Sequence, residues 1–161
     1  MSKGAPDQVN PRSLGVYLEV MSKAVFQSGM SWAVIDKKWP GINEAFQGFE
    51  PLAVASLTEA QIAKLATDTR IIRNRKKVEA IVDNARKIVE LDEKHKGFKK
   101  YLRSHGGFEG TVKDLRKQFR FMGETGCYYF LYVVKEEVPD YDTWCESRGM
   151  VHQHDGAPHA H

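Results

Sequence analysis

The sequence predicts an all-α protein built around one hydrophobic core. Apolar residues recur at intervals of three and four along most of the chain, which is the spacing of amphipathic helices. No segment shows the strict alternation of a convincing strand, and we find no internal repeat or second domain. Of the 161 residues, 42% are hydrophobic and 11% are aromatic, enough to bury a sizeable core.

The first half of the chain is expected to form several helices. An asparagine and a proline, which suit a helix start, precede an apolar stripe over residues 14–25. Trp32 begins a second helix that Pro40 is expected to interrupt, with helix resuming over 42–46. Residues 58–61 have the threonine and glutamine spacing of a capping box, so a short helix should begin there.

The second half contains the clearest amphipathic pattern. Apolar residues form a stripe over 78–89, and the basic residues of this region lie mostly off it. A glycine-rich loop over 106–110 separates this helix from a basic helical segment at 113–118. A final long helix is expected to present a buried face over 127–138.

Two glycines three positions apart, Gly123 and Gly126, separate the basic segment from the final helix. Glycine permits positive φ and close backbone approach, so the N–H groups of such a turn can face a phosphate. Lys117 and Arg120 add positive charge beside the turn, and Thr125 lies within it. The pattern predicts a helix-hairpin-helix that holds DNA by its backbone; an ordinary αα-hairpin is the alternative.

Composition excludes several classes of protein. A formal charge of +3 permits a nucleic-acid partner without requiring one. Cys127 and Cys145 are the only cysteines and form no C-x-x-C pair, so we interpret them as reduced thiols. Residues 1–10 lack the apolar region of an export signal, and no run approaches the length of a membrane span. We therefore expect a cytoplasmic protein with no membrane partner.

The two ends of the chain are expected to lack regular structure. Residues 1–10 are polar and should form a flexible N-terminus, and residues 147–161 should form a disordered tail. The tail holds four histidines outside any periodic pattern. We interpret the tail as disordered with incidental metal affinity; binding of a metal ion by the histidine pairs is the alternative.

A set of segments, taken together and in order, resembles the DNA-3-methyladenine glycosylase I family of helix-hairpin-helix glycosylases. These segments are residues 26–32, 70–77, 83–86 and 119–128. The resemblance runs from about residue 14 to residue 140 and implies a bilobed all-helical domain, which we place at 11–146. It also implies a protein that binds duplex DNA through the minor groove, extrudes a damaged nucleotide and cleaves its N-glycosidic bond.

Base extrusion requires a wedge for the vacated space and a pocket for the flipped base. Met30, beside Gly29 in an exposed-looking turn, is flexible and apolar and is the candidate wedge. Trp32 offers a π-face to a cationic alkylated adenine, and Gln27 can contact a base edge. The alternative is that Met30 and Trp32 are core residues and Gln27 a helix-end amide. The expected base pocket consists of Phe26, Gln27, Trp32 and Tyr128.

The basic run over 73–77 has two interpretations. Arg73 and Lys77 are the candidate phosphate contacts, whereas most charge runs form the solvated face of a surface helix. A third possibility is that Arg73 and Asn74 are buried between the lobes and support the pocket.

The sequence departs from the family pattern at several positions. Ala24 stands where the family has an acidic residue that contacts the damaged base. The family also holds a zinc ion with two cysteines and two histidines; here the N-terminal pair has no counterpart, Tyr141 replaces a histidine and only Cys145 remains. We predict neither a structural metal nor a cofactor. The upstream tyrosines that line the relatives' pocket are missing as well.

Two carboxylates are candidates for the chemistry, Asp140 and Glu19. Asp140 is favoured because many helix-hairpin-helix glycosylases carry, at about this place, an aspartate that stabilises a sugar cation or activates water. The alternative for Asp140 is a turn or helix-capping role. No lysine directly follows the hairpin glycines to act as a Schiff-base nucleophile, so no lyase activity is expected.

The predicted function is monofunctional excision of alkylated purines, 3-methyladenine first, from duplex DNA by a monomer, which would start base excision repair. The main alternative is a non-catalytic helix-hairpin-helix module that binds duplex or damaged DNA. A third possibility is a different damaged base, accepted because the pocket is more open.

Overall fold

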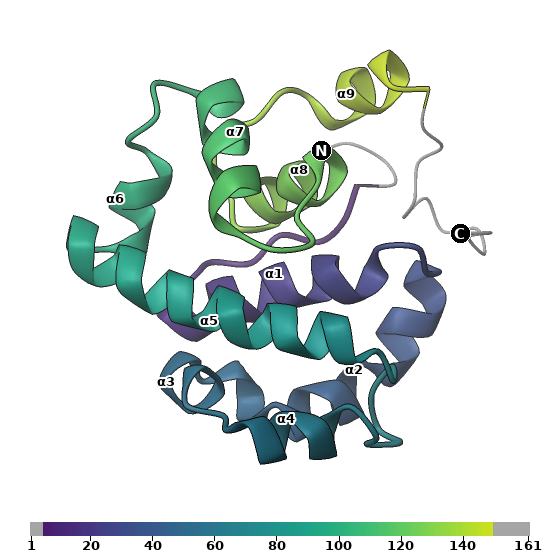
Figure 1. Ribbon diagram of the computed structural model, residues 1–161. Coiled ribbons are helices and arrows are strands. Elements are labelled where there is room, and N and C mark those ends of the chain that lie inside the picture. Colours follow the sequence, from purple (N-terminus) through teal and green to yellow (C-terminus); the bar gives the residue numbers. More distant parts are fainter. Residues whose placement is uncertain (1–4, 150–161) are drawn as a thin grey trace.

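The computed structural model describes residues 5–149, and it confirms the all-α prediction (Figure 1). No strand occurs within this range. The helices are α1 (Leu14–Gln27), α2 (Trp32–Ala45), the 3-10 helix η1 (Gln47–Phe49), α3 (Pro51–Ala55), α4 (Glu59–Leu65), α5 (Arg75–His95), α6 (Phe98–Leu102), α7 (Phe108–Gln118), α8 (Glu124–Val133) and α9 (Tyr141–Ser147).

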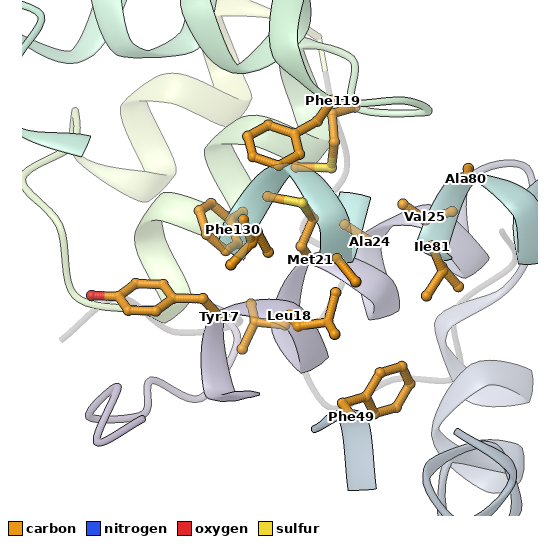
Figure 2. Packing of buried hydrophobic residues seen from close by; sticks show 14 of the residues in the cluster. Tyr17, Leu18, Met21, Ala24, Val25, Phe49, Ala80, Ile81, Phe119 and Phe130 are labelled. Atoms are coloured by element: carbon orange, nitrogen blue, oxygen red, sulfur yellow. The ribbon is translucent and has the colours of Figure 1, made fainter. Parts of the chain in front are cut away.

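Helices α1 and α5 lie at the centre of the molecule. Figure 1 shows α2, α3 and α4 on one side of this pair and α7, α8 and α9 on the other, which is the bilobed arrangement. One buried hydrophobic cluster joins the two lobes. In Figure 2, Phe49 of the first lobe and Phe130 of the second flank Leu18 and Met21 of α1. None of the helices within residues 5–149 combines the length and hydropathy needed to span a bilayer.

The strongest sequence patterns predict their helices correctly. The capping box is present, since Thr58 Oγ1 accepts from the N–H of Gln61 at 3.2 Å and Gln61 Oε1 accepts from the N–H of Thr58 at 2.8 Å. Most of the apolar stripe of α5 is buried against α1 and α3. Helices α3, α6 and α9 are too short for a periodic pattern, and we did not predict them.

The predicted interruption at Pro40 is wrong, because α2 runs through the proline without a break. Proline removes one helical hydrogen bond, but its fixed φ is compatible with a helix. Pro40 is exposed, so the carbonyl left free near it can bind water. The neighbouring Gly41 is required for close packing, since a Cβ there would lie 3.2 Å from the carbonyl oxygen of Arg70.

The final helix is shorter than predicted. Helix α8 ends at Val133, and Lys135 adopts a left-handed conformation with φ of 64°. The buried Val134 and the half-buried Val138 therefore continue the apolar pattern outside the helix. Tertiary packing, not helical phase, explains the apolar residues of this segment.

The α7–α8 hairpin is attached to the middle of α5 by one buried amide. Asn84 Oδ1 accepts from the N–H of Arg120 at 2.9 Å, and Asn84 Nδ2 donates to the carbonyl of Arg120 at 3.1 Å. Asn84 is only 1% exposed, so these bonds are difficult for water to replace. The amide thus fixes the position of the hairpin turn relative to both lobes.

We expect the substitution Asn84→Ala to lower the free energy of unfolding by about 2 to 3 kcal/mol, because it leaves two backbone groups of Arg120 without partners. Urea denaturation followed by circular dichroism measures this change. Asp83→Asn is the matched control, since Asp83 contacts Arg120 only through an exposed ion pair, and it should cost less than about 1 kcal/mol. Equal losses in the two variants would contradict this role of Asn84.

Candidate functional site

The turn between α1 and α2 is tightly closed by local hydrogen bonds. Gln27 Nε2 donates to the carbonyl of Met30 at 3.0 Å, and the N–H of Met30 donates to the carbonyl of Gln27 at 2.7 Å. Gly29 has a φ of 79°, a conformation that favours glycine. Ser31 Oγ caps α2 by accepting from the N–H of Ala33. The turn is therefore compact; Ser28 and Gly29 are exposed, and Met30 is half-buried against the main core.

A small cavity lies beside this turn, and we call it the aromatic cavity. Its volume is about 30 Å³, room for one or two water molecules. Helices α1, α2, α8 and α9 and the N-terminal segment supply its lining. The lining residues are Pro6, Ala24, Gln27, Trp32, Thr125, Gly126, Tyr128, Tyr129, Tyr132, Tyr141, Trp144 and Cys145. No ionisable carboxylate or cation is among them.

Three of the residues predicted for the base pocket line the aromatic cavity, namely Gln27, Trp32 and Tyr128. Phe26 does not, and this prediction is wrong. Its side chain is fully buried in the main core, with ring centroids 6.0 Å from Phe46 and 6.4 Å from Trp39. Helical geometry explains the difference, because residues 24 and 27 share a face of α1 that position 26 does not.

Most of the aromatic residues that form the wall of the cavity were not predicted from the sequence. Tyr129 packs on Trp32 with ring centroids 4.6 Å apart, and Trp144 stacks on Tyr128 at 4.1 Å. Tyr132 and Tyr141 complete this side of the cavity. The expectation of a more open pocket is therefore wrong, since these rings occupy the space. The helical spacing of the tyrosines at 128 and 132, and of the aromatic residues at 141 and 144, is a sequence signal that could have found them.

Tyr128, Tyr129 and Tyr132 are neutral phenols near neutral pH, because burial raises the pKa of each. Burial is the main cause that raises the pKa of Tyr128, and negative charge nearby, including that of Asp140, adds to it. Burial also raises the pKa of Tyr129, followed by the charges of Asp36 and Glu19. The hydroxyl of Tyr128 donates to the carbonyl of Pro139 at 2.5 Å. The cavity thus offers π-faces and neutral hydrogen-bonding groups.

The two candidate carboxylates lie outside the cavity lining. Asp140 is exposed and caps α9, where its Oδ2 accepts from the N–H and the hydroxyl of Thr143, each at 3.1 Å. It directly precedes Tyr141, a lining residue, and its charge acts on Tyr128 in the same lining. Glu19 lines a separate groove, where it accepts from Trp39 Nε1 at 2.9 Å and from Asn43 Nδ2 at 3.4 Å.

The hairpin turn differs from the expected glycine geometry. Its left-handed residue is Phe121, with a φ of 58°, whereas Gly123 has a φ of −84° and caps α8. No side chain caps this helix within the described part of the chain, so the first N–H groups of α8 are available to an anion. Thr125 and Gly126 of this first turn border the aromatic cavity. The hairpin and the cavity therefore share one region of the surface.

The predicted phosphate contacts fall into two groups. Arg73 and Lys117 are exposed and have no ion-pair partner between residues 5 and 149, and Arg120 is exposed but pairs with Asp83 at 2.7 Å. Lys77 is different, because it is only 6% exposed and its ammonium group bonds to backbone carbonyls inside the protein. Its predicted contact with phosphate is therefore wrong. Asn74 caps α5 and is exposed, so it does not lie between the lobes.

The described residues contain no group of three or more histidine, cysteine, aspartate or glutamate side chains placed to hold a metal ion. Cys127 and Cys145 are both buried and reduced. Residues 150–161, which carry the tail histidines, lie outside the described residues. The N-terminal segment is described from residue 5, and Gln8 Nε2 donates to the carbonyl of Tyr132 at 2.9 Å.

Comparison with known proteins assigns the chain to a family. The family model for methyladenine glycosylases matches residues 14–118, more than half of the chain. The chain belongs to the methyladenine glycosylase family. The resemblance seen in the sequence is thereby confirmed. The family match ends before α8 and α9, the helices that supply the tyrosine wall of the cavity.

Individual relatives support the same family. DNA-3-methyladenine glycosylase 1 of Escherichia coli (strain K12) is 29% identical over 126 residues, which is 65% of this chain and 67% of the relative. DNA-3-methyladenine glycosylase of Haemophilus influenzae (strain Rd KW20) is 31% identical over 126 residues, 65% of this chain and 68% of the relative. A solved structure of 3-methyladenine DNA glycosylase I from Staphylococcus aureus, which concerns recognition of 3-methyladenine, superimposes with a TM-score of 0.69 at 28% identity and covers 78% of each chain.

Proposed function

We propose that this family member is a DNA N-glycosylase that flips alkylated purines, 3-methyladenine first, out of duplex DNA and excises them, which starts base excision repair. The observation that carries the proposal is the position of the aromatic cavity. An uncharged, ring-lined cavity borders both the Met30 turn and the free N-terminus of α8. The segments proposed as wedge, pocket and phosphate-binding turn are thus close to one another, which supports the proposal because base flipping needs all three.

The cavity suits a cationic alkylated base. Trp32 and the tyrosines offer π-faces, and a cation over such a face gains about 0.5 to 2 kcal/mol. Since 3-methyladenine in DNA is positively charged, it is already a good leaving group and needs no proton from an acid. The absence of a carboxylate from the lining, with Ala24 at the family's acidic position, is therefore compatible with activity.

A cavity of about 30 Å³ is too small for a purine, so the aromatic wall must move when a base enters. The N-terminal segment is a part of the wall that belongs to no helix. Pro6 lines the cavity, and the segment is held to α8 by Gln8 and by the N–H of Val9, which donates to the carbonyl of Val133 at 2.8 Å. We propose that displacement of this segment widens the cavity.

Asp140 is the proposed catalytic carboxylate. Its charge acts on Tyr128 of the cavity lining, and a negative charge near the base can stabilise the sugar cation that develops as the base leaves, or orient the attacking water. A role for Glu19 in the chemistry stays a prediction, since Glu19 lines a neighbouring groove that shares Pro6 and Tyr129 with the cavity. We propose further that the protein acts as a cytoplasmic monomer on duplex DNA without a cofactor.

Lys117 is proposed to contact a phosphate beside the hairpin turn. We expect Lys117→Ala to weaken DNA binding severalfold at low salt and to reduce the slope of log affinity against log salt by about 1, because one fewer counterion is released. Fluorescence anisotropy with a labelled duplex at several salt concentrations measures both quantities. Lys64→Ala, on α4 in the other lobe, is the control and should change neither. An unchanged slope for Lys117→Ala would exclude Lys117 from the DNA interface.

The experiment that tests the proposed function counts abasic sites in methylated duplex DNA. A monofunctional glycosylase leaves abasic sites that break the strand only after alkali treatment. Strand breaks before alkali would indicate lyase activity and contradict a monofunctional enzyme. Salt-sensitive DNA binding without abasic sites would favour the non-catalytic DNA-binding module.

A further inference from the structure

Lys77 is a buried lysine at the beginning of α5 whose ammonium group is used inside the protein. Its Nζ donates to the carbonyl of Phe26 at 3.0 Å and to the carbonyl of Ser28 at 2.6 Å. Burial lowers the pKa of Lys77. Both hydrogen bonds cross from α5 to a segment about fifty positions earlier in the chain. They join the longest helix of the described protein to the end of α1.

The two carbonyls lie at the C-terminal end of α1 and in the residue that follows it, where backbone carbonyls need hydrogen-bond donors from outside the helix. The last carbonyls of a helix have no N–H partner within it, and Phe26 lies in the last turn of α1. A positive charge at the C-terminal end of a helix is also favoured by the helix dipole. Ser28 follows α1 and is already part of the turn that leads to α2. Lys77 therefore binds both the end of the helix and the turn.

The remaining hydrogen bonds of this turn are local. Within the described residues, positions 27–31 bond only to one another and to the adjoining ends of α1 and α2, apart from the bond to Lys77. Local bonds hold the shape of the turn, and its position relative to the rest of the molecule also depends on packing of Met30 on the main core and of Trp32 on Tyr129. The bond from Lys77 to Ser28 adds an attachment to α5.

This attachment matters because of what the turn carries. It contains the half-buried Met30, and Trp32, the first residue of α2, lines the aromatic cavity. Pushing a base out of the stack costs a few kcal/mol, so a wedge must resist an opposing force of that size. A turn held by packing alone would yield more readily to that force than one also held by a charged hydrogen bond. A turn anchored to α5 keeps Met30 and Trp32 in place.

We infer that Lys77 is a positioning residue for base flipping, which clamps the α1–α2 turn to α5 so that Met30 can enter the base stack while Trp32 stays aligned with the cavity. The inference rests on the proposed function. It assigns no covalent role to Lys77, because its ammonium group is engaged by two carbonyls and is remote from solvent.

The test compares Lys77→Met, which keeps the aliphatic stem and removes the charge, with Lys76→Met, its exposed neighbour on α5. Wedge insertion is measured by the fluorescence of 2-aminopurine placed opposite an abasic-site analogue in a duplex saturated with protein. Excision is measured by single-turnover release of base from methylated DNA. Circular dichroism confirms that each variant is folded at the assay temperature. Lys77→Gln, which keeps one donor, provides a milder variant if Lys77→Met does not fold.

We expect Lys77→Met to lower both the fluorescence change and the single-turnover rate about tenfold, the value of one charged hydrogen bond, while the affinity for undamaged duplex stays within about twofold. Lys76→Met should match the wild type. Unchanged fluorescence and rate in Lys77→Met, or a loss of affinity alone, would overturn the inference. If the wild type shows wedge insertion but releases no base, the proposed function fails, and the fluorescence of the variants still decides the role of Lys77.

Discussion

Trp32→Ala is expected to reduce the rate of base release about 10- to 100-fold. The substitution removes the π-face against which the flipped base would lie, and base–aromatic stacking contributes about 1 to 3 kcal/mol per base. It also removes the partner of Tyr129, whose ring lies 4.6 Å away. Because only the flipped state uses this face, affinity for undamaged duplex should change little. Release of labelled base under single-turnover conditions gives the rate.

Trp32 is also 3% exposed, so its truncation carries a stability cost of about 3 to 5 kcal/mol. Trp39→Ala is the matched control, since it removes a half-buried tryptophan of α2 that does not line the aromatic cavity. Trp32→Phe retains a smaller ring and should keep an intermediate rate. A rate for Trp39→Ala as low as that for Trp32→Ala, at equal folded fractions, would show that stability and not stacking accounts for the loss.

Asp140→Asn is expected to lower the turnover of base release about 10- to 100-fold with little change in thermal stability. Asparagine caps a helix about as well as aspartate, so the hydrogen bond to the N–H of Thr143 can be kept while the charge is lost. A stabilising charge aimed at a developing cation contributes to the transition state and not to ground-state binding. The measurements are kcat, KM and the unfolding temperature of the same preparations.

Thr143→Val separates the two roles of Asp140. It removes the side-chain hydrogen bond of the cap but leaves the carboxylate charge in place. Turnover should therefore survive in Thr143→Val. Wild-type turnover in Asp140→Asn would contradict the catalytic assignment and leave Asp140 with its capping role alone.

Sequence patterns that depend on neighbours along the chain predicted the fold well. The stripe of α5, the capping box at Thr58 and the position of Trp32 after the glycine-containing turn all follow from local spacing. The continuity of α2 through Pro40 does not follow from local spacing. It involves packing against other parts of the molecule, including the close approach of Gly41 to Arg70. At such points tertiary packing overrides the intrinsic helix propensity of the residues.

The site was harder to predict, because its residues come from distant segments. The stacking of Trp144 on Tyr128 joins α9 to α8 and closes the cavity, and no local pattern specifies that contact. Lys77 illustrates the opposite case. It belongs to a basic run, yet it stands four and eight positions before the buried Ile81 and Ala85, so helical phase places it on the buried face of α5. The helical phase therefore distinguishes the buried Lys77 from the exposed Arg75 and Lys76.

The most direct test of the central claim is the identity of the base released from methylated duplex DNA by the purified wild-type protein, determined by mass spectrometry beside Trp32→Ala. We predict that free 3-methyladenine is released by the wild type and is nearly absent with the variant. Intact methylated DNA after prolonged incubation, with the protein folded and bound to it, would contradict the assignment of a glycosylase.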